Sequence, residues 1–364
     1  MHKNVLLAGI SLLALASTYA YADLLVGIAG PMTGQYASAG DQIRKGAEMA
    51  IADINAKGGV IGQKIKLEIG DDACDPKQAV SVANTMVNKK IVFMHGHWCS
   101  SSTIPASDVY NEAQIPMATV STNPQVTERG LKNIFRIMGR DDQQGLVAGD
   151  YLADTYKGKK IAVVDDKSAY GKGLADEIAK AIEAKKVKVA LRESITAGEK
   201  NYSGLVSKLK SAGVEVMAYG GYHTEVALIL RQAQQAGLKL TVMGGDTMTN
   251  SELVTAAGAN ADNVLFTFSP DPRKNPAAAD IVKRFRDAKV EPEGYVMYAY
   301  AAMQLFAQAA EKAKSTKYAD MEKAMRGGSF DTVIGKLSFD AKGDNKLPGF
   351  KVYRWKGNQY DYVN

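Results

Sequence analysis

The sequence has few of the side chains that carry out covalent or metal chemistry. Only two cysteines and four histidines occur among its 364 residues. Neither a G-x-x-x-x-G-K-[ST] loop nor a G-x-G-x-x-G turn is present, so a nucleotide-phosphate site of these kinds is not predicted. Ser100, the first serine of a conspicuous run, does not lie in a G-x-S-x-G elbow. Nucleotide chemistry and serine hydrolysis are therefore poor explanations of this chain.

The excess of positive over negative side chains is also small. The sequence holds 45 Lys and Arg against 39 Asp and Glu, which gives a formal net charge of +6. Its lysine pairs, such as those at 159–160 and 185–186, do not belong to longer basic blocks. Nucleic-acid-binding surfaces normally gather Lys and Arg on one face. We therefore expect no nucleic-acid partner.

Only one uncharged apolar run lies near a terminus. It extends from Val5 to Leu15, follows Lys3 and precedes Ala20-Tyr21-Ala22. A basic start, a short apolar stretch and an A-x-A site are typical of a secretory signal peptide. The run is short for a membrane span of about 20 residues. We expect residues 1–22 to be removed after Ala22, so that the exported chain begins at Asp23.

The expected export of the chain bears on the redox state of its two cysteines, Cys74 and Cys99. An even pair in an exported protein favours a disulfide over free thiols. The bond would close a loop of about 25 residues and contribute roughly 3 kcal/mol in the chain-entropy model. A free Cys99 acting as a nucleophile remains the alternative.

Short apolar runs alternate with amphipathic segments along most of the chain. This pattern predicts βαβ units, and thus α/β lobes built on parallel sheets. The expected strands form two sets: 24–30, 64–72, 91–97, 115–122 and 133–139, then 159–166, 187–195, 214–221, 239–246 and 263–270. After residue 270 the pattern changes to helices and a β-rich tail that could return to either lobe.

The stretch HGHWCSSSTIPAS, residues 95–107, follows an expected strand and permits three interpretations. A zinc site would use His95, His97 and Cys99, but zinc prefers four ligands and Cys99 is better paired with Cys74. A thiol nucleophile needs a free Cys99. The third interpretation is a helix start at which one serine caps the helix, while a spare hydroxyl and the first-turn N–H groups bind a carboxylate. We favour this third interpretation.

A nearby acidic cluster raises the possibility of calcium. Asp71, Asp72 and Asp75 lie close together in IGDDACD. They lack the spacing and the terminal glutamate of a calcium loop. A turn followed by a helix cap is expected instead, and no metal or cofactor is predicted.

Several long motifs resemble one known family. GHWCSSSTIPASDVYNEAQIPM, YGKGLA and YGGYHTEVALILRQAQQAGL are similar to segments of the periplasmic leucine/isoleucine/valine-binding proteins. The resemblance runs from Leu24 to the last expected strands. It implies a type I periplasmic binding protein: two Rossmann-like α/β lobes joined by a hinge of three crossovers. Lobe 1 would comprise residues 23–140 plus 270–347, and lobe 2 residues 141–269 plus 348–364.

The same resemblance implies a ligand site. Ser100 would bind a ligand carboxylate. Thr122, which follows Ser121, would bind both ends of the ligand. Asp246 would bind the ammonium group where the family usually has a glutamate. The expected aromatic walls are Tyr36, Tyr170, Tyr222 and Tyr295.

The implied function is a periplasmic receptor, not an enzyme. It would be a monomer that captures a zwitterionic neutral amino acid, namely leucine, isoleucine or valine, and delivers it to the permease subunits of an ABC importer. One alternative is the same fold binding another neutral amino acid, a short amide or an aromatic acid for transport or sensing. The other is an exported hydrolase that uses Cys99 or a histidine-bound metal.

Overall fold

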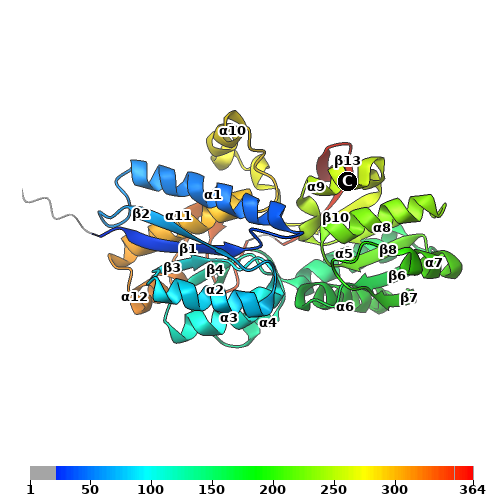
Figure 1. Cartoon of the computed structure of the whole chain (residues 1–364), viewed down its shortest axis with the longest axis horizontal. Coiled ribbons are helices and arrows are strands. Elements are labelled where there is room, and N and C mark those ends of the chain that lie inside the picture. The colour runs from blue at the N-terminus through cyan, green and yellow to red at the C-terminus, as the bar shows by residue number, and fades with distance from the viewer. Residues whose placement is uncertain (1–21, 348, 364) are drawn as a thin grey trace, which may run out of the picture.

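The computed structural model describes residues 22–347 and 349–363 and shows two α/β lobes side by side (Figure 1). The predicted signal peptide lies outside these residues except for Ala22. Each lobe is built around its own sheet, so the predicted two-lobed architecture is confirmed. In the described part of the chain, no helix is long and apolar enough to cross a membrane.

The first sheet has five strands in the order β2-β1-β3-β4-β5, and all of them run parallel. Helices cover both of its faces, with α1 beside α11 on one face and α2 beside α3 on the other (Figure 1). Gly46 allows this close packing, because a Cβ there would overlap the Val296 carbonyl of α11. The elements are β1 (Leu24–Gly30), α1 (Ala37–Ala56), β2 (Ile65–Asp71), α2 (Pro76–Asn88), β3 (Phe93–His95), α3 (Ser100–Glu112), β4 (Met117–Thr119), α4 (Gln125–Glu128) and β5 (Ile134–Arg136).

The second sheet has seven strands in the order β14-β13-β10-β9-β8-β6-β7. Its central strands β6, β8 and β10 are buried at every residue, as expected for parallel strands that are covered on both faces. The edge strand β7 alternates between half-buried and exposed residues. The elements are α5 (Asp141–Thr155), β6 (Ile161–Asp165), α6 (Ala169–Ala184), β7 (Val189–Ser194), α7 (Ser203–Ala212), β8 (Val216–Gly220), α8 (His223–Gln235), β9 (Thr241–Gly244), η1 (Asp246–Thr249), α9 (Glu252–Ala257), η2 (Gly258–Asn263) and β10 (Val264–Phe268).

The C-terminal segment contributes to both lobes. α11 packs on α1 of the first lobe, whereas β13 pairs with β10 of the second lobe. β13 and β14 form a tight antiparallel hairpin, which is the expected β-rich tail, and it adds two strands to the edge of the parallel core of the second sheet. The remaining elements are η3 (Pro272–Lys274), η4 (Pro276–Ala278), α10 (Ala279–Asp287), α11 (Val296–Ala313), α12 (Tyr318–Arg326), β11 (Phe330–Thr332), β12 (Gly335–Leu337), β13 (Lys351–Lys356) and β14 (Gln359–Tyr362).

Candidate functional site

A small cavity lies between the lobes, at the ends of strands from both sheets. In this closed arrangement its lining residues leave only about 10 Å³ of free space. Ligand sites of open α/β sheets occur beyond the carboxyl ends of strands, which is where this cavity lies. Its lining residues are Trp98, Ser100, Val120, Ser121, Thr122, Tyr170, Tyr222, Asp246, Thr247 and Tyr295.

All of the predicted ligand-binding residues except Tyr36 line this cavity. Tyr36 instead packs against Trp98 and Tyr222, with ring centroids 6.1 and 4.4 Å away, and its hydroxyl donates to Glu225 at 3.4 Å. Tyr36 therefore packs on the aromatic residues Trp98 and Tyr222 and does not line the cavity itself. A larger groove of about 740 Å³ opens beside Lys159, Glu215 and Thr241, at the amino ends of β8 and β9. It lies away from the strand ends at which ligands collect.

The serine run forms the first turn of α3, but none of its serines caps the helix. The N-cap residue is Cys99, and no side chain caps it, so the expectation of a serine cap is wrong. The physical reason is that Cys99 is tied to Cys74 and takes an extended conformation, which moves the helix start one residue earlier than a serine cap requires. The first backbone bonds run from Ser102 and Thr103 to the Cys99 carbonyl, both at 2.9 Å. The N–H groups of Ser100 and Ser101 precede them.

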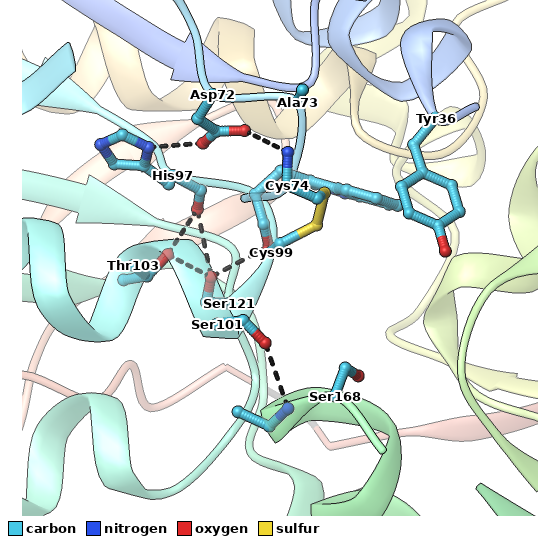
Figure 2. The surroundings of a disulfide bond; sticks show 12 residues. Tyr36, Asp72, Ala73, Cys74, His97, Cys99, Ser101, Thr103, Ser121 and Ser168 are labelled. Carbon is cyan, nitrogen blue, oxygen red and sulfur yellow. Dashed lines mark hydrogen bonds and ion pairs between the residues drawn. A yellow bond between two sulfur atoms is a disulfide. The ribbon is translucent and has the colours of Figure 1, made fainter. Parts of the chain in front are cut away.

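Each serine of the run has different surroundings. The Ser100 hydroxyl is buried in the cavity wall and accepts from the Asn123 N–H at 3.4 Å. Ser101 accepts from the Ala169 N–H at 3.1 Å, which links α3 of the first lobe to α6 of the second (Figure 2). Ser102 is buried, and its hydroxyl has no partner among residues 22–347 and 349–363. Ser100 alone of the three faces the cavity.

The loop after β4 is held rigidly behind the cavity. The Ser121 hydroxyl lies 3.1 and 2.9 Å from the carbonyl oxygens of His97 and Trp98 (Figure 2). Buried Arg136 donates to the backbone oxygens of Ser121 and Asn123, at 2.5 and 3.0 Å. The Ser121 side chain therefore supports the loop, whereas the neighbouring Thr122 lines the cavity.

The opposite wall carries a buried carboxylate. Asp246 begins η1 and is only 3% exposed. It accepts from the hydroxyls of Tyr295 at 2.5 Å and Tyr170 at 3.1 Å. Burial raises the pKa of Asp246, and hydrogen bonds from Tyr295, Gln144 and Tyr170 oppose this rise. Within the described ranges no Lys or Arg pairs with Asp246, so the wall favours a ligand that brings a cation.

Three lining residues were not predicted, Val120, Thr247 and Trp98, and the largest of them is Trp98. Its ring centroid lies 5.2 Å from that of Tyr222 and 5.4 Å from that of Tyr295. Its indole N–H is buried and has no partner in the part of the chain that the structure describes. The available signal was its position directly before Cys99, at the end of an expected strand. Together with Tyr170 and Tyr222 it makes one side of the cavity aromatic.

The side chains weighed for metal binding have other partners. His97 Nδ1 lies 2.5 Å from the Asp72 carboxylate (Figure 2). Its Nε2 lies 3.3 Å from the Tyr110 hydroxyl. Burial lowers the pKa of His95 to about 4, and its Nδ1 lies 3.1 Å from the Ala118 carbonyl. In residues 22–347 and 349–363 no group of three His, Cys, Asp or Glu side chains is arranged to hold a metal ion.

Cys99 and Asp75 behave as expected. Cys99 forms the predicted disulfide with Cys74, with the Cα atoms 5.5 Å apart, a normal separation for such a bond (Figure 2). Asp75 caps α2 by accepting from the N–H groups of Lys77 and Gln78. The turn and helix cap predicted at this acidic cluster are therefore confirmed.

Several hydrogen bonds cross from one lobe to the other and show that the cleft is closed. Asn123 donates to the Ala169 carbonyl at 2.6 Å, beside the bond from the Ala169 N–H to Ser101. At another edge, Ser38 donates to Glu252 at 2.6 Å. The cavity is therefore enclosed by both lobes.

Comparison with known proteins is consistent with this geometry. The model of a family described as periplasmic binding protein matches residues 24–359. The chain belongs to the periplasmic binding protein family. The Leu/Ile/Val-binding protein homolog 1 of Brucella melitensis is 49% identical, over 99% of each chain. A leucine-, isoleucine-, valine-, threonine-, and alanine-binding protein of Pseudomonas aeruginosa is 44% identical, over 96% of this chain and 95% of the relative.

Solved structures of the family share the fold. A leucine-binding protein of Thermotoga maritima is 24% identical and superposes with a TM-score of 0.85, covering 94% of this chain and 98% of its own. A branched-chain amino acid substrate-binding protein of Streptococcus pneumoniae, solved with isoleucine, is 25% identical with a TM-score of 0.83, covering 94% and 99%. The predicted type I fold and the family resemblance are confirmed.

Proposed function

We propose that this binding protein captures leucine, isoleucine or valine between its lobes and delivers it to the permease subunits of an ABC importer. The observation that carries the proposal is one cavity with Ser100 and Thr122 on the first lobe and a buried, unpaired Asp246 on the second. The printed names of the Brucella and Pseudomonas relatives support the same class of ligand.

The walls suit the two ends of a zwitterion. A ligand carboxylate would accept hydrogen bonds from Ser100 and from the first turn of α3, where N–H groups and the helix dipole favour an anion. The ammonium group would bind Asp246 and the Thr122 hydroxyl. An unpaired buried charge is costly. The ligand ammonium would therefore pair with Asp246, and protein N–H and hydroxyl groups would bind the ligand carboxylate.

The side chain of the ligand would lie against Trp98, Tyr170, Tyr222 and Tyr295. This aromatic surface buries a methylene for about 0.8 kcal/mol and offers no counter-charge to lysine or glutamate. Ligand binding would favour the closed arrangement of the lobes, which the permease then recognises.

The remaining parts of the proposal concern the whole chain. We propose cleavage after Ala22, release into the periplasm and function as a monomer. Lobe 1 would be residues 23–140 plus 270–347, and lobe 2 residues 141–269 plus 348–364. No catalytic step is required, because the ligand leaves unchanged.

A second candidate ligand is a smaller neutral amino acid. The free space in the closed cavity, about 10 Å³, is far below the roughly 300–1,000 Å³ that is usual for ligand sites. Trp98 occupies part of the cleft, and the name of the Pseudomonas relative includes threonine and alanine.

Thermal unfolding of the purified protein with each of the twenty amino acids tests both candidates. Leucine, isoleucine and valine should raise the melting temperature, and at about a hundred times the dissociation constant a ligand adds roughly 2.7 kcal/mol. Lysine, arginine and glutamate should give no shift. A response to alanine and threonine alone would establish the smaller ligand, and no shift with any amino acid would reject the amino-acid assignment.

A further inference from the structure

One segment of the first lobe reaches the second lobe outside the cavity. It comprises residues 31–38 and joins β1 to the first turn of α1. The Asp71 carboxylate holds this segment by accepting from the N–H groups of Met32 and Thr33, at 2.9 and 3.2 Å. All of these residues belong to the first lobe, so the segment keeps its position whether or not the second lobe contacts it.

Tyr36 makes the first contact of segment 31–38 with the second lobe. Its ring centroid lies 4.4 Å from that of Tyr222, and its hydroxyl donates to Glu225 Oε1 at 3.4 Å. The second lobe itself holds Glu225 in position, since the Gly198 N–H donates to Oε1 at 3.1 Å and the Thr224 hydroxyl donates to Oε2 at 2.7 Å. The carboxylate is therefore in place before Tyr36 contacts it.

Ser38 makes the second contact, between a donor and an acceptor of the second lobe. Its hydroxyl donates to Glu252 Oε2 at 2.6 Å and accepts from the Asn250 side-chain amide at 2.8 Å. Asn250 and Glu252 are also linked to each other, because the Glu252 N–H donates to Asn250 Oδ1 at 2.9 Å. The second lobe thus offers a ready-made site for a single hydroxyl group of the first lobe.

His223 orients the Glu252 carboxylate. The imidazole is buried, and its Nε2 lies 3.1 Å from the same Oε2 atom that accepts from Ser38. An ionised carboxylate only accepts hydrogen bonds, so this contact requires the proton on Nε2. The hydrogen bond from His223 lowers the pKa of Glu252 below its ordinary value; burial acts in the opposite direction, and Ser38 adds to the lowering. At neutral pH Ser38 therefore donates to a full negative charge.

These contacts cover the cavity from outside. α8, which carries Glu225, packs against α9, which carries Glu252, and neither carboxylate lines the cavity. Tyr36 packs on Trp98 and Tyr222, which do line it. Both hydroxyl–carboxylate contacts join one lobe to the other, so both are lost when the lobes separate.

We propose that segment 31–38 is a latch, in which Tyr36 and Ser38 bind Glu225 and Glu252 once the cleft has closed and so set the rate at which the ligand leaves. This inference rests on the proposed function. The four side chains do not line the cavity, so they act as positioning residues for the closed state. An open protein has neither contact, and the rate of ligand entry should not depend on them.

Stopped-flow tryptophan fluorescence with valine, and separately with alanine, measures the association and dissociation rates. Trp98 provides the signal because it contacts Tyr222 of the second lobe. Tyr36→Phe and Ser38→Ala each remove a hydrogen bond to a carboxylate, and one of the two carboxylates is half-exposed. Each variant should raise the dissociation rate roughly 5- to 30-fold and leave the association rate within about twofold of wild type. The unfolding midpoint of the ligand-free protein should stay unchanged.

Two matched variants serve as controls. Tyr318→Phe removes a phenol hydroxyl from α12, at the far end of the first lobe from the cleft (Figure 1). Ser81→Ala removes a hydroxyl from the exposed side of α2. Both should release valine and alanine at the wild-type rate.

A double variant tests whether Ser38 acts through Glu252. Ser38→Ala and Glu252→Ala break the same hydrogen bond, so the double variant should release valine no faster than Glu252→Ala alone. Independent effects that multiply in the double variant would contradict the assigned pairing.

The outcomes separate the latch from the proposed function. Wild-type dissociation rates in both Tyr36→Phe and Ser38→Ala would overturn the latch and leave the proposed function intact. A matching change in the association rate or in the stability of the ligand-free protein would also overturn it, because these residues would then only support the fold. If wild type binds neither valine nor alanine, the proposed function fails and the latch fails with it.

Discussion

Buried charged side chains have partners of opposite charge on one side of the cleft and lack them on the other. On the first-lobe side, Arg136 is completely buried, yet Asp344 pairs with it at 2.7 Å, and His97 lies 2.5 Å from Asp72. On the second-lobe side, Asp141 and Asp246 are buried, and no salt bridge to either is found among residues 22–347 and 349–363. The first side is electrostatically complete, whereas the second lacks a cation.

This difference assigns different tasks to the two sides. Paired charges hold the loops after β3 and β4 in place, so that neutral hydroxyls and N–H groups can face the cavity. Unpaired acids leave the other wall dependent on what enters the cleft. Removing a charge from the first side should therefore damage the fold, while removing one from the second should damage binding.

The largest effect is expected from Asp344→Ala, which leaves Arg136 buried without its carboxylate. Breaking a buried ion pair in this way costs about 3–5 kcal/mol of unfolding free energy. Chemical denaturation at neutral pH measures the loss. Asp331→Ala removes the carboxylate of an exposed pair with Lys336 and should cost less than about 1 kcal/mol.

The effect of Asp344→Ala should depend on pH. Although burial acts to raise it, the charges of Arg136 and Arg140 hold the pKa of Asp344 below its ordinary value. A carboxylate with a depressed folded-state pKa stabilises the fold above its unfolded pKa, near 3.9, and loses that contribution as the pH falls through the folded value. The difference between wild type and variant should shrink in acid. A difference that stays constant down to acid unfolding would contradict the pairing.

Asp246→Ala tests the second side and should act on binding. Losing a charge-assisted hydrogen bond to the ligand costs about 1.5–3 kcal/mol, or roughly 10- to 150-fold in dissociation constant. Calorimetric titration with leucine or valine measures it. Ser102→Ala is the control, because that hydroxyl has no partner in the described ranges. Wild-type affinity in Asp246→Ala would show that the ammonium group binds elsewhere.

The smallest effect is expected where the two sides meet. Ser101→Ala removes the acceptor of the Ala169 N–H and should weaken ligand binding by about 1 kcal/mol, or roughly fivefold, because the closed state loses one neutral hydrogen bond. The same titration measures it, with Ser81→Ala on exposed α2 as the control. Equal affinities of the two variants would mean that this bond does not stabilise the liganded closed state.

Much of the fold followed from local patterns. Fully buried strands such as β6 and β10 are mostly apolar, each with a single polar residue, and the helices between them repeat apolar residues at helical spacing. Cavity residues such as Ser100 and Asp246 were predicted because they lie in loops after strands, within motifs that resemble a family. The antiparallel edge formed by β13 and β14 was not predicted, since the pairing of a tail depends on contacts distant in sequence.

The features that escaped prediction depend on three-dimensional neighbours. Asp141 lies in the sequence Arg-Asp-Asp, which has the appearance of a solvated helix start, and only the fold shows that it is completely buried. The serine run resembled a helix cap, but the disulfide at Cys99 determines where α3 begins. No role was predicted for Trp98, because its contact with Tyr222 exists only when the two lobes meet.

The position of β13 has a consequence for how the chain folds. β10 is buried along its whole length, and one of its two hydrogen-bonding edges is covered by β13, which lies more than 80 residues later in the sequence. Until β13 arrives, β10 is a bare edge strand of the kind that recruits other chains. Truncation before Lys351 should therefore leave the second lobe prone to aggregation. During synthesis the free edge of β10 stays open to pairing with other chains until the chain is almost complete.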